Sequence, residues 1–173
     1  MTDIAEWARH GWHRAVRTAA YVLMPKFTAG AVVVAREDDH PQGPRVLLVR
    51  KRTGGDRWGF PAGYVGYGTS IVETTVSELA EETGLRPPID IAGHLRTYRQ
   101  PWAMHLDHLF LVAATGEPHV HDGMEIADAT WWPIGALPDL ADEVRLALTE
   151  VPDLLTRPIP QAGAPTPAAP PRG

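Results

Sequence analysis

Three glutamates, Glu78, Glu81 and Glu82, stand close together near the middle of the sequence. If this stretch is helical, Glu78 and Glu82 lie one turn apart on one face and Glu81 lies beside them. Like charges at this spacing cost about a few tenths of a kcal/mol per pair, so a countercharge is expected. A hard divalent cation suits such oxygen ligands. For the three glutamates alone, a solvated acidic helix face is the simpler interpretation.

A glycine-rich segment directly precedes the glutamates and changes this balance. It contains Gly59, Gly63, Gly66, Gly68 and Pro61. Such a backbone folds tightly, and just before a helix its carbonyls can approach a metal while its amides approach a phosphate. The loop and the glutamates together therefore indicate a site for a metal and a diphosphate.

The element that must carry the glutamates is a helix with clear signals at both ends. Ser70 followed by Glu73 is a capping box, so we expect a helix to start near Ile71. Gly84 is suited to a left-handed C-terminal cap. The spacing further predicts a core-facing stripe made of Val72, Val76, Leu79 and Thr83.

The flanking sequence alternates between strand-like and helical patterns. We expect strands over 28–36, 45–52, 89–99, 105–115 and 130–133, and a last helix over 140–151. Strands interrupted by one central helix and followed by another predict an α/β protein in which helices sandwich a mixed central β-sheet.

Composition sets limits on the function. The chain has 173 residues, of which 44% are hydrophobic and 21% charged, with a net charge of −5. This is typical of one folded domain, and the acidic balance argues against a protein that coats nucleic acid. Because there is no cysteine, disulfide scaffolds, zinc ribbons, iron–sulfur clusters and cysteine nucleophiles are excluded. A metal must be held by carboxylate, imidazole or carbonyl groups.

The N-terminal region, residues 1–24, is predicted to contain an amphipathic helix. Its apolar positions are Ile4, Ala8, Trp12, Ala15, Ala19 and Val22. We expect this helix to pack on the domain or on a second subunit, and we predict a homodimer; contact with a membrane surface is the alternative.

The remaining chain divides into the domain proper, residues 25–155, and a tail, residues 156–173. The tail is rich in Pro and Ala and has no apolar period, so we expect it to be disordered. The acidic start lacks the order of a secretory signal, and no apolar run approaches the ~18 residues of a transmembrane segment. A cytoplasmic location is therefore expected.

The segment from Gly63 to Leu85 resembles the signature of the Nudix hydrolases, G-x5-E-x7-R-E-U-x-E-E-x-G-U, in which U is an aliphatic residue. All but two of the specified positions match in register. The two departures are Thr69, where the family has its first box glutamate, and Ser77, where it has an arginine. Without that guanidinium the neighbouring carboxylates lose a fixed countercharge, so a weaker or altered metal site is expected.

The resemblance implies roles for particular residues. Glu78 and Glu82 are the principal metal ligands, and Glu81 is either a ligand or the base that activates water. The carbonyl of Ala62 adds a further oxygen ligand. Glu125 is our candidate for a base outside the signature, with a structural cap or ion pair as the alternative. The implied cofactor is Mg²⁺, with Mn²⁺ as an alternative.

Further residues are candidates for binding substrate. Arg50 and Arg52 end a predicted strand and share one face, so both can point toward the diphosphate; solvated strand-end charges are the alternative. Gly63 begins the signature and offers its backbone to the substrate. Trp102 can stack on an adenine or nicotinamide ring, or be partly buried beside the sheet.

The resemblance implies a metal-dependent hydrolase that cleaves a phosphoanhydride in a small diphosphate. Pro101 resembles a proline of the ADP-ribose pyrophosphatases, and Gln100-Pro101-Trp102 resembles part of an NADH pyrophosphatase motif, which favours a dinucleotide-like substrate. Two alternatives stay open: a Nudix-fold binding or regulatory domain with little hydrolysis, and an enzyme acting on a specialised non-nucleotide diphosphate.

Overall fold

The computed structural model describes residues 26–53, 55–120 and 124–160. The helix predicted within residues 1–24 lies outside the described residues, as do residues 161–173 of the predicted tail. The N-terminal helix and the homodimer built on it therefore stay predictions. None of the helices in the described part of the chain has both the length and the apolar character needed to cross a bilayer.

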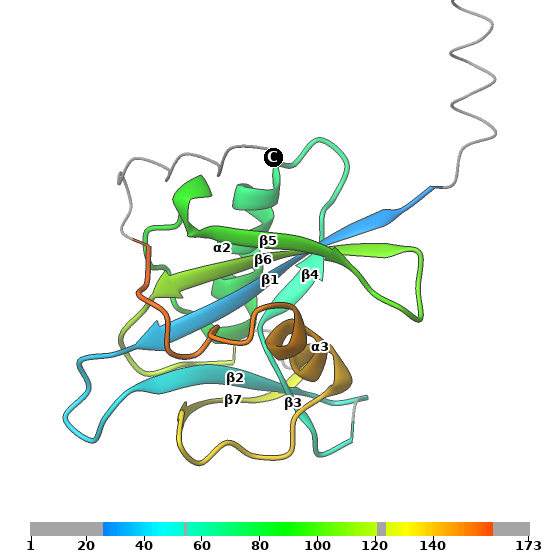
Figure 1. Ribbon diagram of the computed structural model, residues 1–173. Coiled ribbons are helices and arrows are strands. Elements are labelled where there is room, and N and C mark those ends of the chain that lie inside the picture. Colours follow the sequence, from blue (N-terminus) through cyan, green and yellow to red (C-terminus); the bar gives the residue numbers. More distant parts are fainter. Residues whose placement is uncertain (1–25, 54, 121–123, 161–173) are drawn as a thin grey trace, which may run out of the picture.

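Strands dominate the described chain, and two α-helices accompany them (Figure 1). In chain order the elements are β1 (Thr28–Glu37), β2 (Arg45–Lys51), β3 (Trp58–Gly59), β4 (Ala62–Tyr64), α2 (Ile71–Thr83), the 3-10 helix η1 (Ile91–Gly93), β5 (His94–Arg99), β6 (His105–Ala113), β7 (Ile126–Pro133) and α3 (Asp142–Glu150). The short strands β3 and β4 were not expected from the sequence, because neither is long enough to show an alternating pattern.

The strands form one mixed sheet in the order β3-β2-β1-β6-β5, with β4 paired to β1 and β7 paired to β2. The central strand β1 runs parallel to β6 along its whole length and antiparallel to its other neighbours. The C-terminal end of β1 pairs with β2, whereas its N-terminal half pairs with β4. The mixed sheet that the sequence predicts is thus confirmed.

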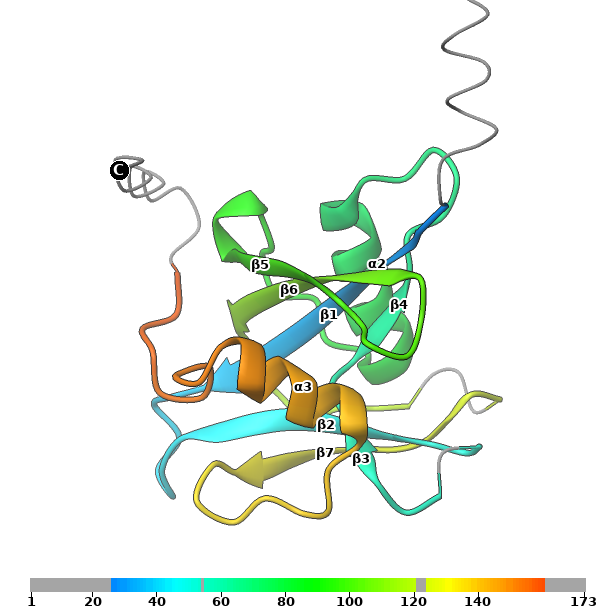
Figure 2. The same cartoon turned by 45° about the vertical axis from the view of Figure 1, so that its right-hand side comes forward.

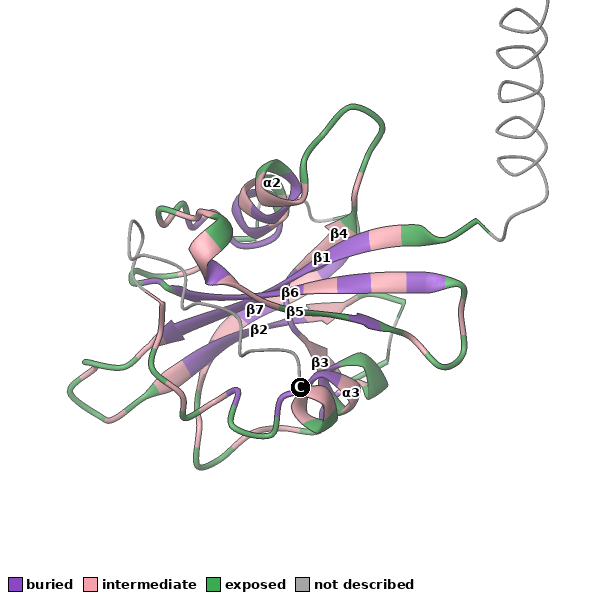
Figure 3. Ribbon diagram, turned by 45° about the horizontal axis from the view of Figure 1, so that its top comes forward, coloured by how far each residue is buried: buried purple, intermediate pink, exposed green. Residues whose placement is uncertain are grey.

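The two helices cover opposite faces of the sheet (Figures 2 and 3). On the α2 face, Leu79 packs with Val33 and Leu47 in one hydrophobic cluster. On the α3 face, Val144 and Ala147 pack with strand residues in a second, larger cluster. Alternate residues of each strand feed the two clusters, as the period of an extended chain requires. The described domain is therefore an α/β/α sandwich.

Helix α2 has the predicted ends but a different buried face. Ser70 and Glu73 form the capping box, and Gly84 adopts the left-handed conformation as C-cap. The predicted apolar stripe is wrong at Val72 and Val76, which are only partly buried. The buried side chains are instead Thr74, Thr75, Leu79, Ala80, Glu82 and Thr83. The three threonines are suited to burial because each hydroxyl donates a hydrogen bond to the backbone carbonyl one turn earlier.

Other predicted elements differ at their boundaries. The strand expected over 89–99 begins with η1 and becomes extended only at His94, and β7 starts at Ile126 rather than at residue 130. The chain also keeps contact with the domain beyond residue 155, since Arg36 Nη1 donates to the carbonyl of Arg157 at 2.8 Å and Ile159 packs against the core. The first residues of the predicted tail thus lie against the domain.

Candidate functional site

The site begins with Glu82, which α2 carries into the interior. Its side chain is buried, with 5% of the residue exposed. Its Oε2 atom accepts a hydrogen bond from the backbone N–H of Ala62 at 3.1 Å. This bond ties α2 to β4, the short strand that follows the Gly59–Pro61 segment. The backbone of Ala62 therefore contacts a site glutamate through its amide, while the role predicted for its carbonyl stays a prediction.

Glu78, one turn earlier on α2, lies against Gly63. A Cβ atom placed on Gly63 would come within 1.9 Å of the Glu78 carboxyl carbon and 2.0 Å of its Oε1 atom. Real atoms do not approach that closely, so only glycine leaves room for the carboxylate here. The structure thus brings together two of the predicted residues, one from the loop and one from the helix.

Lys51 supplies a positive charge beside the glutamates. It ends β2 on the same face as Leu47, which packs with Leu79 of α2. Its ammonium lies 3.1 Å from Oε1 of Glu125. The backbone N–H of Arg52 donates to the carbonyl of Glu125 at 2.9 Å and holds that loop residue in place. Glu125, far away in sequence, is thereby brought to the end of β2.

The carboxylates raise one another's affinity for protons. Burial raises the pKa of Glu82 from 4.5 to about 8, and the charges of Glu78 and Glu125 add to this, against the opposing effects of Lys51 and the Ala62 amide. Burial, followed by the charges of Glu81 and Glu125, also raises the pKa of Glu78. Burial disfavours the charge of Lys51, but its bond to Glu125 and the nearby carboxylates raise its pKa overall.

These groups fit a hard divalent cation in one respect and not in another. Several carboxylates share a single ammonium, and additional positive charge would offset their repulsion. However, across residues 26–53, 55–120 and 124–160, no three Asp, Glu, His or Cys side chains gather as a ready-made metal cage. Glu81 is exposed on α2. Glu78 and Glu82 are the carboxylates that lie nearest the loop, while the ligand role of Glu81 stays a prediction. Mg²⁺ commonly uses one or two carboxylates, completed by waters and substrate phosphates.

A cavity of about 310 Å³ opens beside these groups. Its walls are Gly30, Ala31, Val32, Lys51, Arg57, Gly59, Phe60, Ala62, Gly63, Tyr64, Gln100, His105, Asp107, Ala141, Glu143 and Val144. It therefore reaches from the ends of β2 and β4 to β6 and the first turn of α3. Its size suits part of a nucleotide-sized ligand.

Three predicted substrate-binding side chains are absent from these walls. The guanidinium of Arg50 instead lies 3.8 Å from Asp56 and 3.9 Å from Asp128. Arg52 is exposed beyond the end of β2, and Trp102 is 55% exposed in the turn between β5 and β6. Alternation along β2 turns Lys51, rather than Arg50, toward α2, and the substrate-binding role of Arg50, Arg52 and Trp102 stays a prediction.

Sequence reasoning missed the polar residues on the far wall, among them His105 and Asp107. Both are buried, with 8% and 3% of their surface exposed. They share one face of β6 with Leu109 and Leu111, because all four stand at every second position. Leu109 and Leu111 belong to the hydrophobic cluster on the α3 face. The sequence signal was available: two polar residues stand at the same period-2 positions as the apolar residues of this strand. Buried polar groups need hydrogen-bond partners, so such positions indicate a polar site.

Comparison with known proteins identifies this arrangement. The family model for the NUDIX domain matches residues 24–151. This chain belongs to the NUDIX family. The Nudix fold accounts for the mixed sheet between two helices, and the signature expected from the sequence covers the loop and helix that carry Gly63, Glu78 and Glu82.

Relatives show how far the likeness extends. MutT4 of Mycobacterium tuberculosis (strain CDC 1551 / Oshkosh) is 30% identical over 156 residues, which cover 84% of this chain and 63% of MutT4. The NUDIX domain of Shewanella oneidensis NrtR, in a cocrystal structure with ADP ribose, has a TM-score of 0.63 at 21% identity, covering 81% of this chain and 97% of that one.

A bifunctional NMN adenylyltransferase/ADP ribose pyrophosphatase from Francisella tularensis, complexed with AMP and an Mn ion, is also similar. Its TM-score is 0.56 at 18% identity, over 82% of this chain and 46% of that one. At these identities the two structures establish the Nudix fold. The chain spans about 63% of the length of MutT4.

The two departures from the Nudix signature lie at the edge of the site. Thr69 Oγ1 donates to the carbonyl of Gly66 at 2.9 Å and lies 3.4 Å from Thr74 Oγ1, so it stabilises the loop. Ser77 is exposed on α2, next to Glu78. Neither brings charge to the glutamates, which leaves Lys51 as their described cationic neighbour.

Proposed function

We propose that this Nudix protein is a divalent-metal-dependent hydrolase that cleaves the phosphoanhydride of a nucleotide-containing diphosphate. The observation that carries the proposal is the burial of Glu82 beside Glu78 and Lys51, where Lys51, Ala62 and Gly63 line a cavity of about 310 Å³. Burying carboxylates together is unfavourable unless a cation offsets their charge. A diphosphate needs the same cation, so one ion can serve both.

Each side chain has a part in this reaction. Glu78 and Glu82 would hold Mg²⁺, with Mn²⁺ as an alternative, and the ion would neutralise the diphosphate and acidify a water molecule. Lys51 stabilises negative charge on the phosphate and orients Glu125 through their 3.1 Å contact. A carboxylate oxygen of Glu125 accepts a proton as the water oxygen attacks phosphorus, and the bond to the bridging oxygen breaks, leaving the electron pair on that oxygen.

Glu125 is favoured over Glu81 as the base. Its charge acts on both Glu78 and Glu82, whereas that of Glu81 acts on Glu78. Glu125 is also 61% exposed, which gives water access to its carboxylate. Glu81 stays the alternative, either as a further metal ligand or as the base that activates water.

The substrate we favour is dinucleotide-like, such as ADP ribose or NADH. The sequence around Pro101 supports this choice, and so do the ADP ribose in the NrtR domain and the AMP and Mn ion in the Francisella tularensis protein. We further propose a cytoplasmic homodimer in which residues 4–23 contribute to the interface.

A second function is favoured by Thr69 and Ser77. Both remove charges that the Nudix signature normally supplies, which suits a domain that binds a diphosphate and hydrolyses it slowly or not at all. An enzyme for a specialised non-nucleotide diphosphate is the third reading of the same departures.

Turnover of a panel of nucleoside-diphosphate-linked compounds, with and without Mg²⁺ or Mn²⁺, tests the proposal. Wild-type protein should release a nucleoside monophosphate only with a metal present, and Glu82→Gln should abolish this release. Glu117→Gln is the matched control, since Glu117 is exposed and away from the cavity walls. Tight binding without turnover would support the binding domain, and turnover of non-nucleotide diphosphates alone would support the third reading.

A further inference from the structure

The cavity has chemically different ends. Lys51 and Arg57 stand at one end, near the strand edge formed by β2 and β3. Asp107 and Gln100 stand at the other, on β6 and at the end of β5. Because β1 and β4 lie between these pairs of strands in the sheet, the two ends are on opposite sides of the cavity. The first end presents two cations, each paired with an exposed carboxylate, and suits phosphate. The second end presents a carboxylate and an amide.

Asp107 is held in position by a chain of hydrogen bonds. Its Oδ2 atom accepts from Gln100 Nε2 at 2.9 Å, and its Oδ1 atom lies 3.1 Å from His105 Nε2. The other ring nitrogen of His105, Nδ1, lies 2.6 Å from Thr28 Oγ1. The carboxylate is therefore contacted by Gln100 and His105, and Thr28 in turn holds the His105 ring.

The ring of His105 is packed tightly between its neighbours. A Cβ atom on Gly30 would come within 2.7 Å of His105 Nε2, so the ring packs directly on the backbone of β1. The ring of Tyr64 meets that of His105 edge-on, with centroids 5.1 Å apart. This packing makes the hydrogen-bonded chain rigid, as a recognition surface requires.

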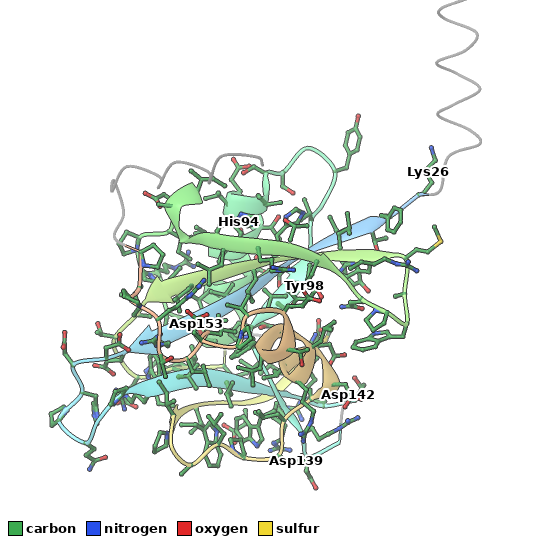
Figure 4. The ribbon with its side chains drawn as sticks, viewed as in Figure 1. Lys26, His94, Tyr98, Asp139, Asp142 and Asp153 are labelled. Atoms are coloured by element: carbon green, nitrogen blue, oxygen red, sulfur yellow. The ribbon has the colours of Figure 1, made fainter. Side chains whose placement is uncertain are left out.

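Asp107 retains acceptor capacity toward the cavity. A carboxylate offers about four lone-pair positions, and the described structure uses one on each oxygen. The ion-pair partner that the structure gives this carboxylate is His105. Glu143, from the first turn of α3, also lines the cavity, and its negative charge raises the pKa of both Lys51 and Tyr98, so it acts toward both ends. Figure 4 labels Tyr98 and Asp142, which mark β5 and the start of α3 on this side of the sheet.

We infer that Asp107, with Gln100, selects the organic part of the substrate by accepting hydrogen bonds from an uncharged N–H or O–H donor group and by repelling an anionic group. The donor is a nucleobase amino group or a ribose hydroxyl, which share this chemistry. The inference rests on the proposed function, because the cationic end then takes the diphosphate. A ligand that lacks this donor forgoes a hydrogen bond to a charged acceptor, so the site discriminates against it.

Equilibrium binding of nucleoside diphosphates without a divalent metal tests this inference independently of hydrolysis. The probes are ADP, purine riboside diphosphate, which lacks the amino group, and 2′,3′-dideoxy-ADP, which lacks the hydroxyls. Wild-type protein should bind ADP about 10- to 100-fold more tightly than one of the two analogues, and the weaker analogue identifies the donor. Asp107→Asn should remove most of that difference, while Glu117→Gln should keep it.

Gln100→Met, which removes the amide that orients Asp107, should reduce the same discrimination and decides the matter if Asp107→Asn melts below wild type. Equal wild-type affinity for all three probes, no binding of any of them, or full discrimination in folded Asp107→Asn would overturn the inference. Failure of the proposed function looks different: discrimination would persist in binding, yet no compound of the hydrolysis panel would be turned over.

Discussion

The carboxylate of Glu78 occupies the space that a side chain on residue 63 would need, because a Cβ on Gly63 would lie 1.9 Å from its carboxyl carbon. The loop and helix of the Nudix signature are thereby interlocked at one point. The glycine that begins the signature is required for the room it leaves for a glutamate, and not for an unusual backbone conformation, since the described glycines with positive φ do not include it.

Gly63→Ala should therefore displace Glu78. We expect metal-dependent turnover to fall about 100-fold, as for an angstrom-scale misplacement, and the free energy of unfolding to fall by about 1–3 kcal/mol. Gly66→Ala is the control, because the nearest atom to its added Cβ would be Thr69 Oγ1 at 3.4 Å. Steady-state kinetics and urea unfolding of both variants give the answer; equal effects would contradict this role of Gly63.

The raised pKa of Glu82 predicts a pH dependence of stability in metal-free protein. Its pKa is about 8 in the folded state against 4.5 ordinarily, so between these values the folded protein binds more protons than the unfolded one. The stability that protonated Glu82 contributes should be fully present below pH 4.5 and should be lost as the pH rises toward 8. Melting temperatures across this range should show the decline in wild type and a flatter profile in Glu82→Gln.

Metal binding should show the opposite trend. Since a cation binds the ionised carboxylate, Mg²⁺ affinity should increase as the pH approaches 8 and Glu82 loses its proton. Isothermal titration with Mg²⁺ at several pH values measures this directly. Affinity independent of pH would exclude Glu82 as a ligand.

Lys51→Met should weaken substrate binding and raise the pKa of Glu82 further, because it removes the ammonium whose charge opposes protonation of that carboxylate. We expect KM to rise about 10-fold, equivalent to roughly 1.4 kcal/mol, with partial rescue in Lys51→Arg. Arg86→Met, at an exposed position outside the cavity walls, is the control. A wild-type KM in Lys51→Met would remove Lys51 from the site.

Ser77→Arg tests whether the altered signature is a simple loss. The side chain at 77 is exposed and stands one turn before Glu81 and next to Glu78, while Glu73 is already engaged with the N–H of Ser70 at 2.7 Å. An arginine here can pair with the free carboxylates and lower their pKa, so we expect tighter Mg²⁺ binding and an acid limb of the rate profile at lower pH. An unchanged or slower enzyme would indicate specialisation.

Deletion of residues 1–23 should lower the association state if the predicted helix contributes to a homodimer. Sedimentation of the truncated and the full chain provides the comparison. Both chains keep the domain that begins at Lys26. Two monomers with the same melting temperature would contradict the predicted interface.

Local sequence was sufficient for helix α2 and for the signature it carries. The capping box of Ser70 and Glu73 and the C-cap at Gly84 appear as predicted because each depends on residues within a few positions. The strand patterns of β1, β2 and β6 were likewise readable, since burial on both faces leaves long apolar runs.

Only the tertiary structure determined which charges meet. The sequence favoured Arg50 and Arg52 for the diphosphate, yet the placement of β2 under α2 presents Lys51. The stripe at Val72 and Val76 was misjudged for the same reason: the rotation of a helix depends on the sheet beneath it, and here that rotation buries Glu82.

The far wall of the cavity depends even more on long-range pairing. Thr28 and His105 are 77 residues apart, but the parallel register of β1 and β6 places them side by side. Asp107 then acquires its partners from β6 and from the end of β5. Contacts between residues this distant follow from strand pairing and packing, which no local pattern encodes, and they are the contacts that shape the cavity.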